Sequence, residues 1–245
     1  MSTQTWSTPL GRMSLPEHEV HVWRARLDVP ARDIPALQWA LSAEENARAA
    51  RFYFERDRSR WIVARGLLRK LLGYYTRTDP RLINFELNRY GKPALAFPTP
   101  HAALQFNVSH SADLALYAFA WRRPLGVDVE YMRPDIEYDQ IARYSFSPVE
   151  QRTLAGLSLE EKHEAFYRCW TRKEAYIKAR GMGLSLSLAL FDVSLLPDEP
   201  AALLCSREDP YEAQRWSMRQ LDPGPGYAGA LVVEGTDWHL QCYDI

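Results

Sequence analysis

The sequence contains few cysteines and no long apolar run. Cys169, Cys205 and Cys242 are odd in number and widely spaced, which argues against a disulfide framework and against a zinc cluster. No stretch is apolar enough to span a bilayer, and residues 1–19 lack the apolar core of a secretory signal. We therefore expect a protein of the reducing cytoplasm.

An excess of charge of one sign is also lacking. The formal net charge is −1, so the chain has no overall field that would attract nucleic acid or an anionic membrane. The sequence also has no P-loop, no kinase motif set and no Gly-x-Ser-x-Gly elbow. The sequence therefore gives no support for nucleic acid or a membrane as a partner. Any site that binds phosphate must depend on a few neighbouring residues and not on the overall charge.

The order strand, helices, strands occurs twice along the 245 residues. In the first pass a strand over 19–29 precedes a helical signal that begins at Ser42, where Glu45 completes a capping box. That signal is long enough to predict two helices. The strands expected next are 83–97 with a turn at 90–93, then 104–110 and 114–121, the last two joined by a turn over 109–113.

The second pass begins after Pro124. It comprises a strand over 125–132, helices over about 141–179, and strands over 191–195, 214–221, 227–235 and 238–244. This order predicts an α+β fold of two similar halves packed together. We expect an N-terminal arm over 1–18, a first half over 19–123 and a second half over 124–245.

The segment Gly126-Val127-Asp128-Val129-Glu130 reads as a strand with paired acids. Residues two apart share a face, so Asp128 and Glu130 stand side by side while the valines point into the core. Adjacent carboxylates repel each other and favour a bound cation, and oxygen ligands suit magnesium or calcium. The alternative is an ordinary solvated strand face that carries two acids.

Three further segments carry polar groups that could act on phosphate. In the helical run 170–178, Glu174 and Lys178 share one face, although spacing alone favours an exposed ion pair. The strand end 107–111 offers hydroxyl, imidazole and backbone donors to phosphate, or is simply a polar turn. In 88–93, Gly91 allows a tight turn that presents Lys92, although Gly-Lys-Pro is also a common loop sequence.

Together these segments resemble the surfactin-type 4′-phosphopantetheinyl transferases. The pieces that carry the resemblance are, in chain order, RFYFERDRSRW, RYGKP, FNVSHS, GVDVE, FSPVE and WTRKEAYIK. The family resemblance implies a pseudo-twofold α+β fold with the active site between the halves, and it implies magnesium and coenzyme A as ligands.

The same resemblance assigns roles to individual residues. Asp128, Glu130 and Glu174 would hold the metal against the pyrophosphate of coenzyme A. The residues placed at coenzyme A itself are Arg60, Arg89, Lys92, Asn107, Ser109, His110 and Lys178, with Lys92 near the adenine and ribose. Catalytic roles fall to Glu174 or Glu150 as the base and to Lys178 as a phosphate ligand.

One stretch departs from the family pattern. Relatives often carry lysines before the RFY segment that meet the 3′-phosphate, whereas this chain has Glu44 and Glu45 there. Arg48 or Arg51 could substitute for those lysines.

The expected reaction transfers phosphopantetheine from coenzyme A to a serine of an apo acyl-, peptidyl- or aryl-carrier protein and releases 3′,5′-ADP. The carriers of fatty-acid, polyketide and nonribosomal peptide synthesis are all possible substrates, and a monomer is expected. Two rival interpretations are another magnesium-dependent phosphoryl enzyme, and a non-catalytic carrier-binding module. The second rival predicts that a metal acid is lost, yet all three acids and Lys178 are present.

Overall fold

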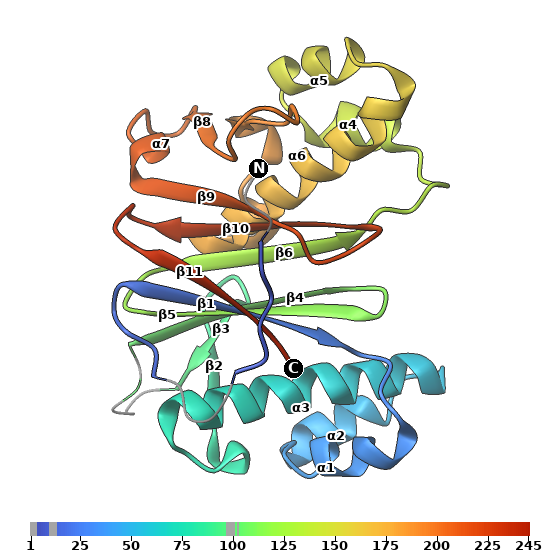
Figure 1. Cartoon of the computed structure of the whole chain (residues 1–245), viewed down its shortest axis with the longest axis vertical. Helices are drawn as coiled ribbons and strands as arrows, with labels where there is room; N and C mark the ends of the chain where they lie inside the picture. Colours follow the sequence, from blue (N-terminus) through green and yellow to red (C-terminus); the bar gives the residue numbers. More distant parts are fainter. Residues whose placement is uncertain (1–3, 10–13, 97–100, 102) are drawn as a thin grey trace.

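The computed structural model describes residues 4–9, 14–96, 101 and 103–245 (Figure 1). Parts of the expected N-terminal arm and the last residue of the predicted strand 83–97 therefore lie outside the described residues. The strands are β1 Glu19–Arg26, β2 Phe85–Leu87, β3 Pro93–Leu95, β4 Leu104–Ser111, β5 Leu114–Trp121, β6 Leu125–Tyr131, β7 Phe191–Val193, β8 Leu203–Ser206, β9 Trp216–Leu221, β10 Tyr227–Glu234 and β11 His239–Asp244. The helices are α1 Ile34–Gln38, α2 Ala43–Ala49, α3 Glu55–Thr76, α4 Tyr138–Ser145, α5 Pro148–Ala155, α6 Leu159–Arg180 and α7 Glu212–Arg215.

Two sheets form the centre of the molecule. The first has the order β11-β1-β5-β4, in which β11 runs parallel to β1 and the other pairs are antiparallel. The second has the order β6-β10-β9 and is antiparallel throughout. Two short hairpins, β2–β3 and β7–β8, lie outside these sheets. The C-terminal strand β11 thus belongs to the sheet that the first half begins.

Three apolar clusters separate four layers (Figure 1). One cluster fills the space between α3 and the first sheet. A second lies between the two sheets and contains Val127 and Val129 of β6. The third packs α4, α5 and α6 against the second sheet. The order of layers is therefore helix, sheet, sheet, helix, and α3 and α6 lie on opposite outer faces.

The α+β fold class predicted from the sequence is confirmed. The long helical signal does divide into two helices, α2 and α3, and Ser42 and Glu45 form the predicted capping box. The turn expected over 109–113 is shorter than predicted, because β4 continues to Ser111. Residues 109–111 pair with residues 114–116 of β5, so their backbone belongs to the sheet and not to the turn. Strand β8 and helix α7 were not predicted, and α7 takes up the first two residues of the predicted strand 214–221.

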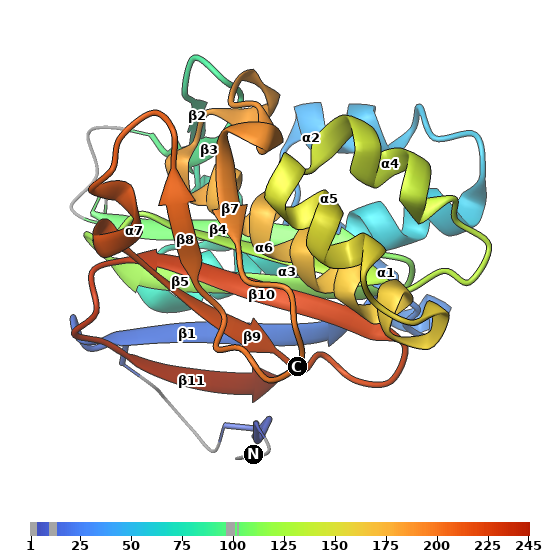
Figure 2. The same ribbon diagram turned by 90° about the horizontal axis from the view of Figure 1, so that it is seen from above.

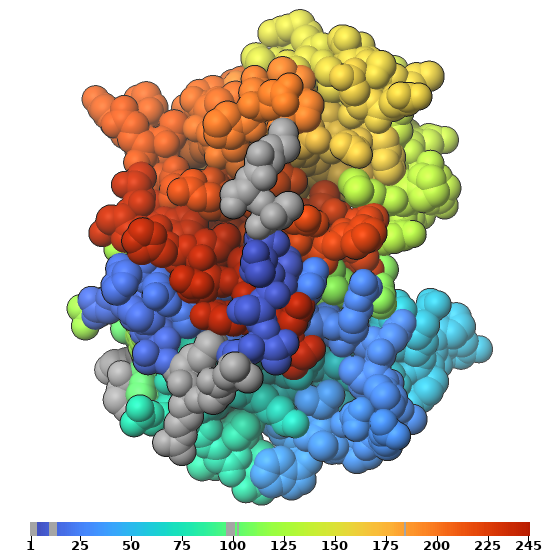
Figure 3. All heavy atoms as spheres, in the orientation of Figure 1, coloured from blue at the N-terminus to red at the C-terminus, as the bar shows by residue number. Residues whose placement is uncertain are grey.

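Residues 4–9 lie along the outer edge of β11 (Figure 3). The Ser7 N–H donates to Cys242 O (3.1 Å), and Trp6 Nε1 donates to Asp222 O (2.7 Å). This segment therefore contacts β11 of the first sheet and the loop that follows β9 of the second sheet. The division of the chain at Pro124 stays a prediction. No helix in the described ranges combines the length and the apolar character needed to cross a bilayer.

Candidate active site

Two serines of β4 bind the two acids of β6. Ser109 Oγ donates to Asp128 Oδ1 (2.8 Å), and Ser111 Oγ donates to Glu130 Oε2 (2.7 Å). Both acids lie on the face of β6 opposite the valines that enter the core, as expected for alternate strand residues. The two sheets therefore meet between β4 and β6 at a polar cluster of side chains, here called the seam, which begins with Ser109, Ser111, Asp128 and Glu130.

Helix α6 approaches this seam through Gly126. A Cβ on Gly126 would lie 2.1 Å from Ala175 O and 2.4 Å from Ala179 N, so a larger residue would force the helix away from β6. Glu174 and Lys178 each precede one of these alanines in the sequence. The close backbone contact thus places both polar residues of α6 beside the acids of β6.

Lys178 pairs with Asp128. Its Nζ lies 2.6 Å from Asp128 Oδ1 and 2.9 Å from Ser109 Oγ. The Lys178 side chain is 27% exposed and the Asp128 side chain only 3% exposed. The sequence alternative for this lysine was an exposed pair with Glu174, whereas the structure pairs it with a buried acid on another element.

The seam carries more negative charge than Lys178 offsets. Burial, and then the charge of Asp128, raise the pKa of Glu174 to about 7. The same two causes raise the pKa of Glu130, against the hydrogen bond from Ser111. Three carboxyl groups therefore lie close enough to oppose one another's ionisation, which is the arrangement that a bound cation would relieve.

Asp128 has an acceptor atom to spare. Its Oδ2 is one of three buried side-chain nitrogen or oxygen atoms that lack a hydrogen-bond partner in the described residues, and it is the only carboxylate oxygen in that set. An unpaired buried acceptor is costly. Within the same residues, no three His, Cys, Asp or Glu side chains are arranged so that they could hold a metal ion as they stand. The free oxygen and the all-carboxylate donor set nevertheless fit a hard divalent cation.

Among the described residues, three others that the resemblance assigned to coenzyme A form no hydrogen bond with the acids of the seam. His110 is exposed near the end of β4, on the strand face whose earlier residues Leu104 and Phe106 pack into the core, and desolvation and then the charge of Lys178 lower the pKa of its imidazole. Arg60 forms a two-pronged pair with Asp28, with both N–O distances 2.7 Å. Arg89 is exposed and lies over the ring of Tyr90. Of these three, His110 is the one within electrostatic reach of Lys178.

Two of the assigned residues hold the fold together. Asn107 Oδ1 accepts the Val127 N–H (2.8 Å), which adds another link between β4 and β6. Lys92 Nζ donates to Leu125 O (2.9 Å) and Ala179 O (3.3 Å). Burial lowers the pKa of the Lys92 ammonium to about 8, so the charged form still predominates at neutral pH.

Glu150 lies away from the seam, at the start of α5. Its Oε2 accepts the Ser147 N–H of a capping box (2.8 Å) and lies 2.7 Å from Lys173 Nζ. Its Oε1 accepts the Val193 N–H (2.8 Å). Both oxygens are occupied and the side chain is 2% exposed. These contacts argue against Glu150 as the base and leave Glu174 as the candidate.

Sequence reasoning included Ser111 in the polar strand end 107–111 but did not predict its bond to Glu130, and it missed Lys173. Ser111 follows Ser109 by two residues, so the strand period could have indicated that both face the acids. Lys173 is fully buried on α6, and its Nζ donates to Leu188 O (2.7 Å) and Phe191 O (2.6 Å). A lysine so deeply buried has no signal in a single sequence.

A cavity of about 750 Å³ lies between α2, α3 and the β2–β3 hairpin. Its polar and aromatic lining residues include Glu44, Glu45, Arg48, Trp61, Arg65, Arg69, Asn84 and Phe85. Arg48 lies over the ring of Trp61, and Arg65 lies over the ring of Phe85 at 4.0 Å. Rings paired with guanidinium groups suit a flat, negatively charged ligand.

The acid that departs from the family pattern is neutralised. Glu45 pairs with both Arg65 and Arg69 at 2.5 Å, and Arg48 lies on the wall of the same cavity. Arg51 lines a neighbouring cavity of about 480 Å³, together with Arg48. This side of the molecule therefore keeps basic groups despite the two glutamates.

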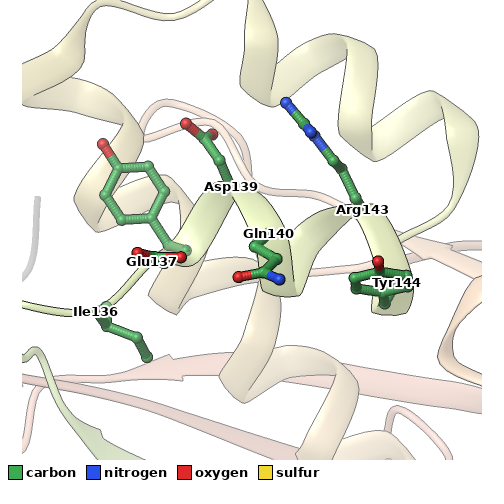
Figure 4. A pocket seen from close by; sticks show the side chains of 7 residues that line it. Ile136, Glu137, Asp139, Gln140, Arg143 and Tyr144 are labelled. Carbon is green, nitrogen blue, oxygen red and sulfur yellow. The ribbon is translucent and has the colours of Figure 1, made fainter.

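A different cavity, of about 530 Å³, lies along α4 (Figure 4). The side chains that line it include Ile136, Gln140, Arg143 and Tyr144. The Tyr144 ring is 83% exposed. Helix α4 follows β6 directly in the chain, so this cavity lies on the segment that leads away from Glu130.

Two family models match the chain. One, described as the 4′-phosphopantetheinyl transferase superfamily, matches residues 124–232. The other, described as 4′-phosphopantetheinyl transferase, N-terminal, matches residues 31–121. Together they cover most of the chain, and residues 122 and 123 separate the two matches.

Curated relatives carry the same description. The chain is 38% identical to the 4′-phosphopantetheinyl transferase HetI of Nostoc sp. over 97% of both chains. It is 31% identical to the 4′-phosphopantetheinyl transferase Sfp of Bacillus subtilis, over 81% of this chain and 84% of Sfp. Among solved structures, the holo-[acyl-carrier-protein] synthase of Thermotoga maritima matches 46% of this chain and 63% of that chain, with 22% identity and a TM-score of 0.38.

Proposed function

The chain belongs to the 4′-phosphopantetheinyl transferase superfamily and is a 4′-phosphopantetheinyl transferase, and from this premise we propose its substrates, its metal and the roles of its residues. The donor is coenzyme A, and the acceptor is a serine of an apo acyl-, peptidyl- or aryl-carrier protein. The enzyme is a cytoplasmic monomer. The observation that carries the proposal is the seam at which Asp128, Glu130, Glu174 and Lys178 meet.

The acids of the seam would hold magnesium. Asp128 contributes the buried oxygen that has no partner, and Glu130 and Glu174 contribute the carboxylates whose ionisation their neighbours oppose. A bound magnesium ion would supply positive charge to the pyrophosphate of the donor. Calcium shares the preference for oxygen ligands, but phosphate sites usually hold magnesium.

The residues of the chain bind the donor phosphates and move one proton. The Lys178 ammonium lies at the seam and offers N–H donors to the phosphates, while the Ser109 hydroxyl accepts from that ammonium and donates to Asp128. The serine oxygen of the carrier attacks the β-phosphorus, and the bridging P–O bond breaks to release 3′,5′-ADP. We assign the serine proton to Glu174, the carboxylate of α6 that lies beside Lys178 and the two acids of β6.

The adenosine end of the donor occupies the cavity beside α2. Arg48, Arg65 and the ring of Trp61 line that cavity and suit an adenine with its 3′-phosphate. Arg48 is the candidate that replaces the lysines of the family pattern, and Arg51 of the adjoining cavity is the second candidate.

The carrier approaches from the α4 side. The donor cavity lies on the helices of the first half, so the acceptor serine must reach the seam from elsewhere. Helix α4 begins shortly after Glu130 and presents the exposed ring of Tyr144 beside Arg143 (Figure 4). Glu137 and Asp139 lie on the same cavity wall. The part formed by Arg143 and Tyr144, a basic residue beside an exposed aromatic, therefore suits the acidic helices that the family resemblance gives to carrier proteins.

Intact-mass spectrometry tests the proposed function. An apo carrier protein incubated with the enzyme, coenzyme A and magnesium should gain the mass of one phosphopantetheine, and EDTA should abolish the gain. Fatty-acid, polyketide and peptide-type carriers are tested in parallel. A gain that persists in EDTA would reject the metal assignment, and no gain on any carrier would reject the proposed acceptor class.

A further inference from the structure

The β2–β3 hairpin of the first half contacts the C-terminal end of α6 in the second half (Figure 2). Lys92 Nζ donates to Ala179 O (3.3 Å), and Asn88 Nδ2 donates to Gly181 O (2.7 Å). The Asn88 side chain also accepts the Lys92 N–H (2.9 Å), which braces the turn of the hairpin. Two carbonyls at the helix end are therefore bound by a segment that lies far away in the sequence.

Such carbonyls need partners. The last turn of an α-helix leaves its carbonyls without intrahelical donors, and they carry the negative end of the helix dipole. A cation at that end is favourable, and helices often supply it from their own last turn. The last turn of α6 contains Lys178 and Arg180, but these bind Asp128 and Glu212. The cation at Ala179 O is Lys92, 87 positions earlier in the chain.

The same ammonium also binds the start of β6. Lys92 Nζ lies 2.9 Å from Leu125 O, next to Gly126, where α6 and β6 touch through their backbones. One charged group thus fixes the end of the helix that carries Glu174 and Lys178 against the strand that carries Asp128. A shift of α6 along β6 would change the 2.6 Å distance from Lys178 Nζ to Asp128 Oδ1.

We propose that Lys92 is a positioning residue for phosphopantetheine transfer, which clamps the C-terminal end of α6 to β6 and so sets Lys178 and Glu174 against the acids of β6. This inference rests on the proposed function of the seam. It differs from the role that the family resemblance assigned to Lys92 at the adenine and ribose. The backbone around Lys92 lines the donor cavity through Gly91 and Pro93, whereas the ammonium is directed to the two carbonyls.

The test compares Lys92→Met and Lys92→Arg with Lys70→Met, a control on an exposed lysine of α3. Lys92→Met should lower kcat about 10- to 100-fold, because misplacing reacting groups by a fraction of an ångström is that costly. Its affinity for adenosine 3′,5′-bisphosphate, measured by calorimetry, should stay within about threefold. Lys92→Arg, which keeps a cation with several donors, should recover most of the lost kcat.

Hydrogen exchange gives a readout that does not depend on turnover. Backbone amides over 178–183 should exchange faster in Lys92→Met than in wild type, and Lys92→Arg should restore their protection. If Lys92→Met instead weakens binding of the bisphosphate tenfold or more and leaves kcat intact, Lys92 contacts the donor and the inference is wrong. An unchanged kcat together with unchanged exchange also overturns it. If wild type modifies no carrier, the proposed function fails, and the exchange measurement alone decides the clamp.

Discussion

Two lysines of α6 face carboxylates, and their surroundings are opposite. Lys173 and Glu150 are 0% and 2% exposed, and hydrogen bonds occupy both oxygens of the acid. Lys178 and Asp128 are 27% and 3% exposed, one oxygen of the acid has no partner, and two more carboxyl groups lie nearby. The first pair is complete in itself. The second retains the capacity to bind a cation and a phosphate.

This contrast separates a structural ion pair from a functional one within a single helix. A buried pair recovers its desolvation cost only when every donor and acceptor is satisfied. The Lys173 pair meets that condition and joins α5, α6 and β7. The Lys178 pair does not, and a native protein retains such a cost mainly where the site acts on a ligand.

The largest expected effect on turnover lies beside the Lys178–Asp128 pair, here called the open pair. Glu174→Gln should lower turnover at least about 100-fold, because the amide can neither take the serine proton nor complete the set of carboxylates. The melting temperature should stay the same or rise, because the substitution removes a buried carboxyl group whose ionisation is disfavoured by burial and by the neighbouring acids. Turnover is measured by carrier mass shift and stability by calorimetry. Near-normal turnover would remove Glu174 from the mechanism.

Substitutions in the Lys173–Glu150 pair, here called the closed pair, should lower the stability of the protein. Lys173→Met leaves Glu150 buried and uncompensated, which typically costs about 3–5 kcal/mol. In a chain of this size the melting temperature should fall by roughly 10 °C. The double variant Lys173→Met, Glu150→Gln is the matched control and should recover part of that loss. A single variant as stable as wild type would show that the two pairs do not differ as described.

An intermediate effect is expected where β4 supports the open pair. Ser109→Ala removes the hydroxyl that donates to Asp128 and accepts from Lys178. Turnover should fall about tenfold, since one hydrogen bond to a charged group contributes about 1.5 kcal/mol. Ser109→Thr keeps a hydroxyl at this position and serves as the control. If the alanine variant turns over as fast as wild type, Ser109 does not support the open pair.

The smallest effect is expected far from both pairs. Tyr144→Ala should raise KM for the carrier a few-fold, while kcat and the melting temperature stay within error, because the ring is exposed on α4. Tyr211→Ala, at another exposed tyrosine (72%), is the matched control. If both variants, or neither, alter KM for the carrier, α4 is not the docking side.

The sequence predicted local patterns well and pairings between distant segments poorly. The period of a strand was enough to place Asp128 and Glu130 on one face and the intervening valines in the core. It could not reveal that Lys178 binds Asp128, or that Lys92 binds Ala179 O, because those contacts depend on how α6 crosses β6. The close approach that decides this crossing occurs at Gly126, and a glycine within a strand can equally mark a bulge or a bend.

For Glu150, a local signal in the sequence competes with the assignment by family resemblance. Its place in a family segment suggested a base, yet its position three residues after Ser147 is also that of a capping box, which the structure contains. A local signal for a helix start was present in the sequence, and it describes this residue better than its assignment by resemblance. The buried partner Lys173 completes the structural role.

The parallel pairing of β11 with β1 also has a consequence for biosynthesis. β1 leaves the ribosome before its neighbour on one side, residues 239–244, which are translated more than two hundred residues later. Until then one edge of the nascent sheet has unpaired N–H and C=O groups, which other chains can bind. A nascent chain stalled after Pro124 would therefore be a natural client for chaperones that cover open strand edges, and pairing of β11 with β1 would later close that edge.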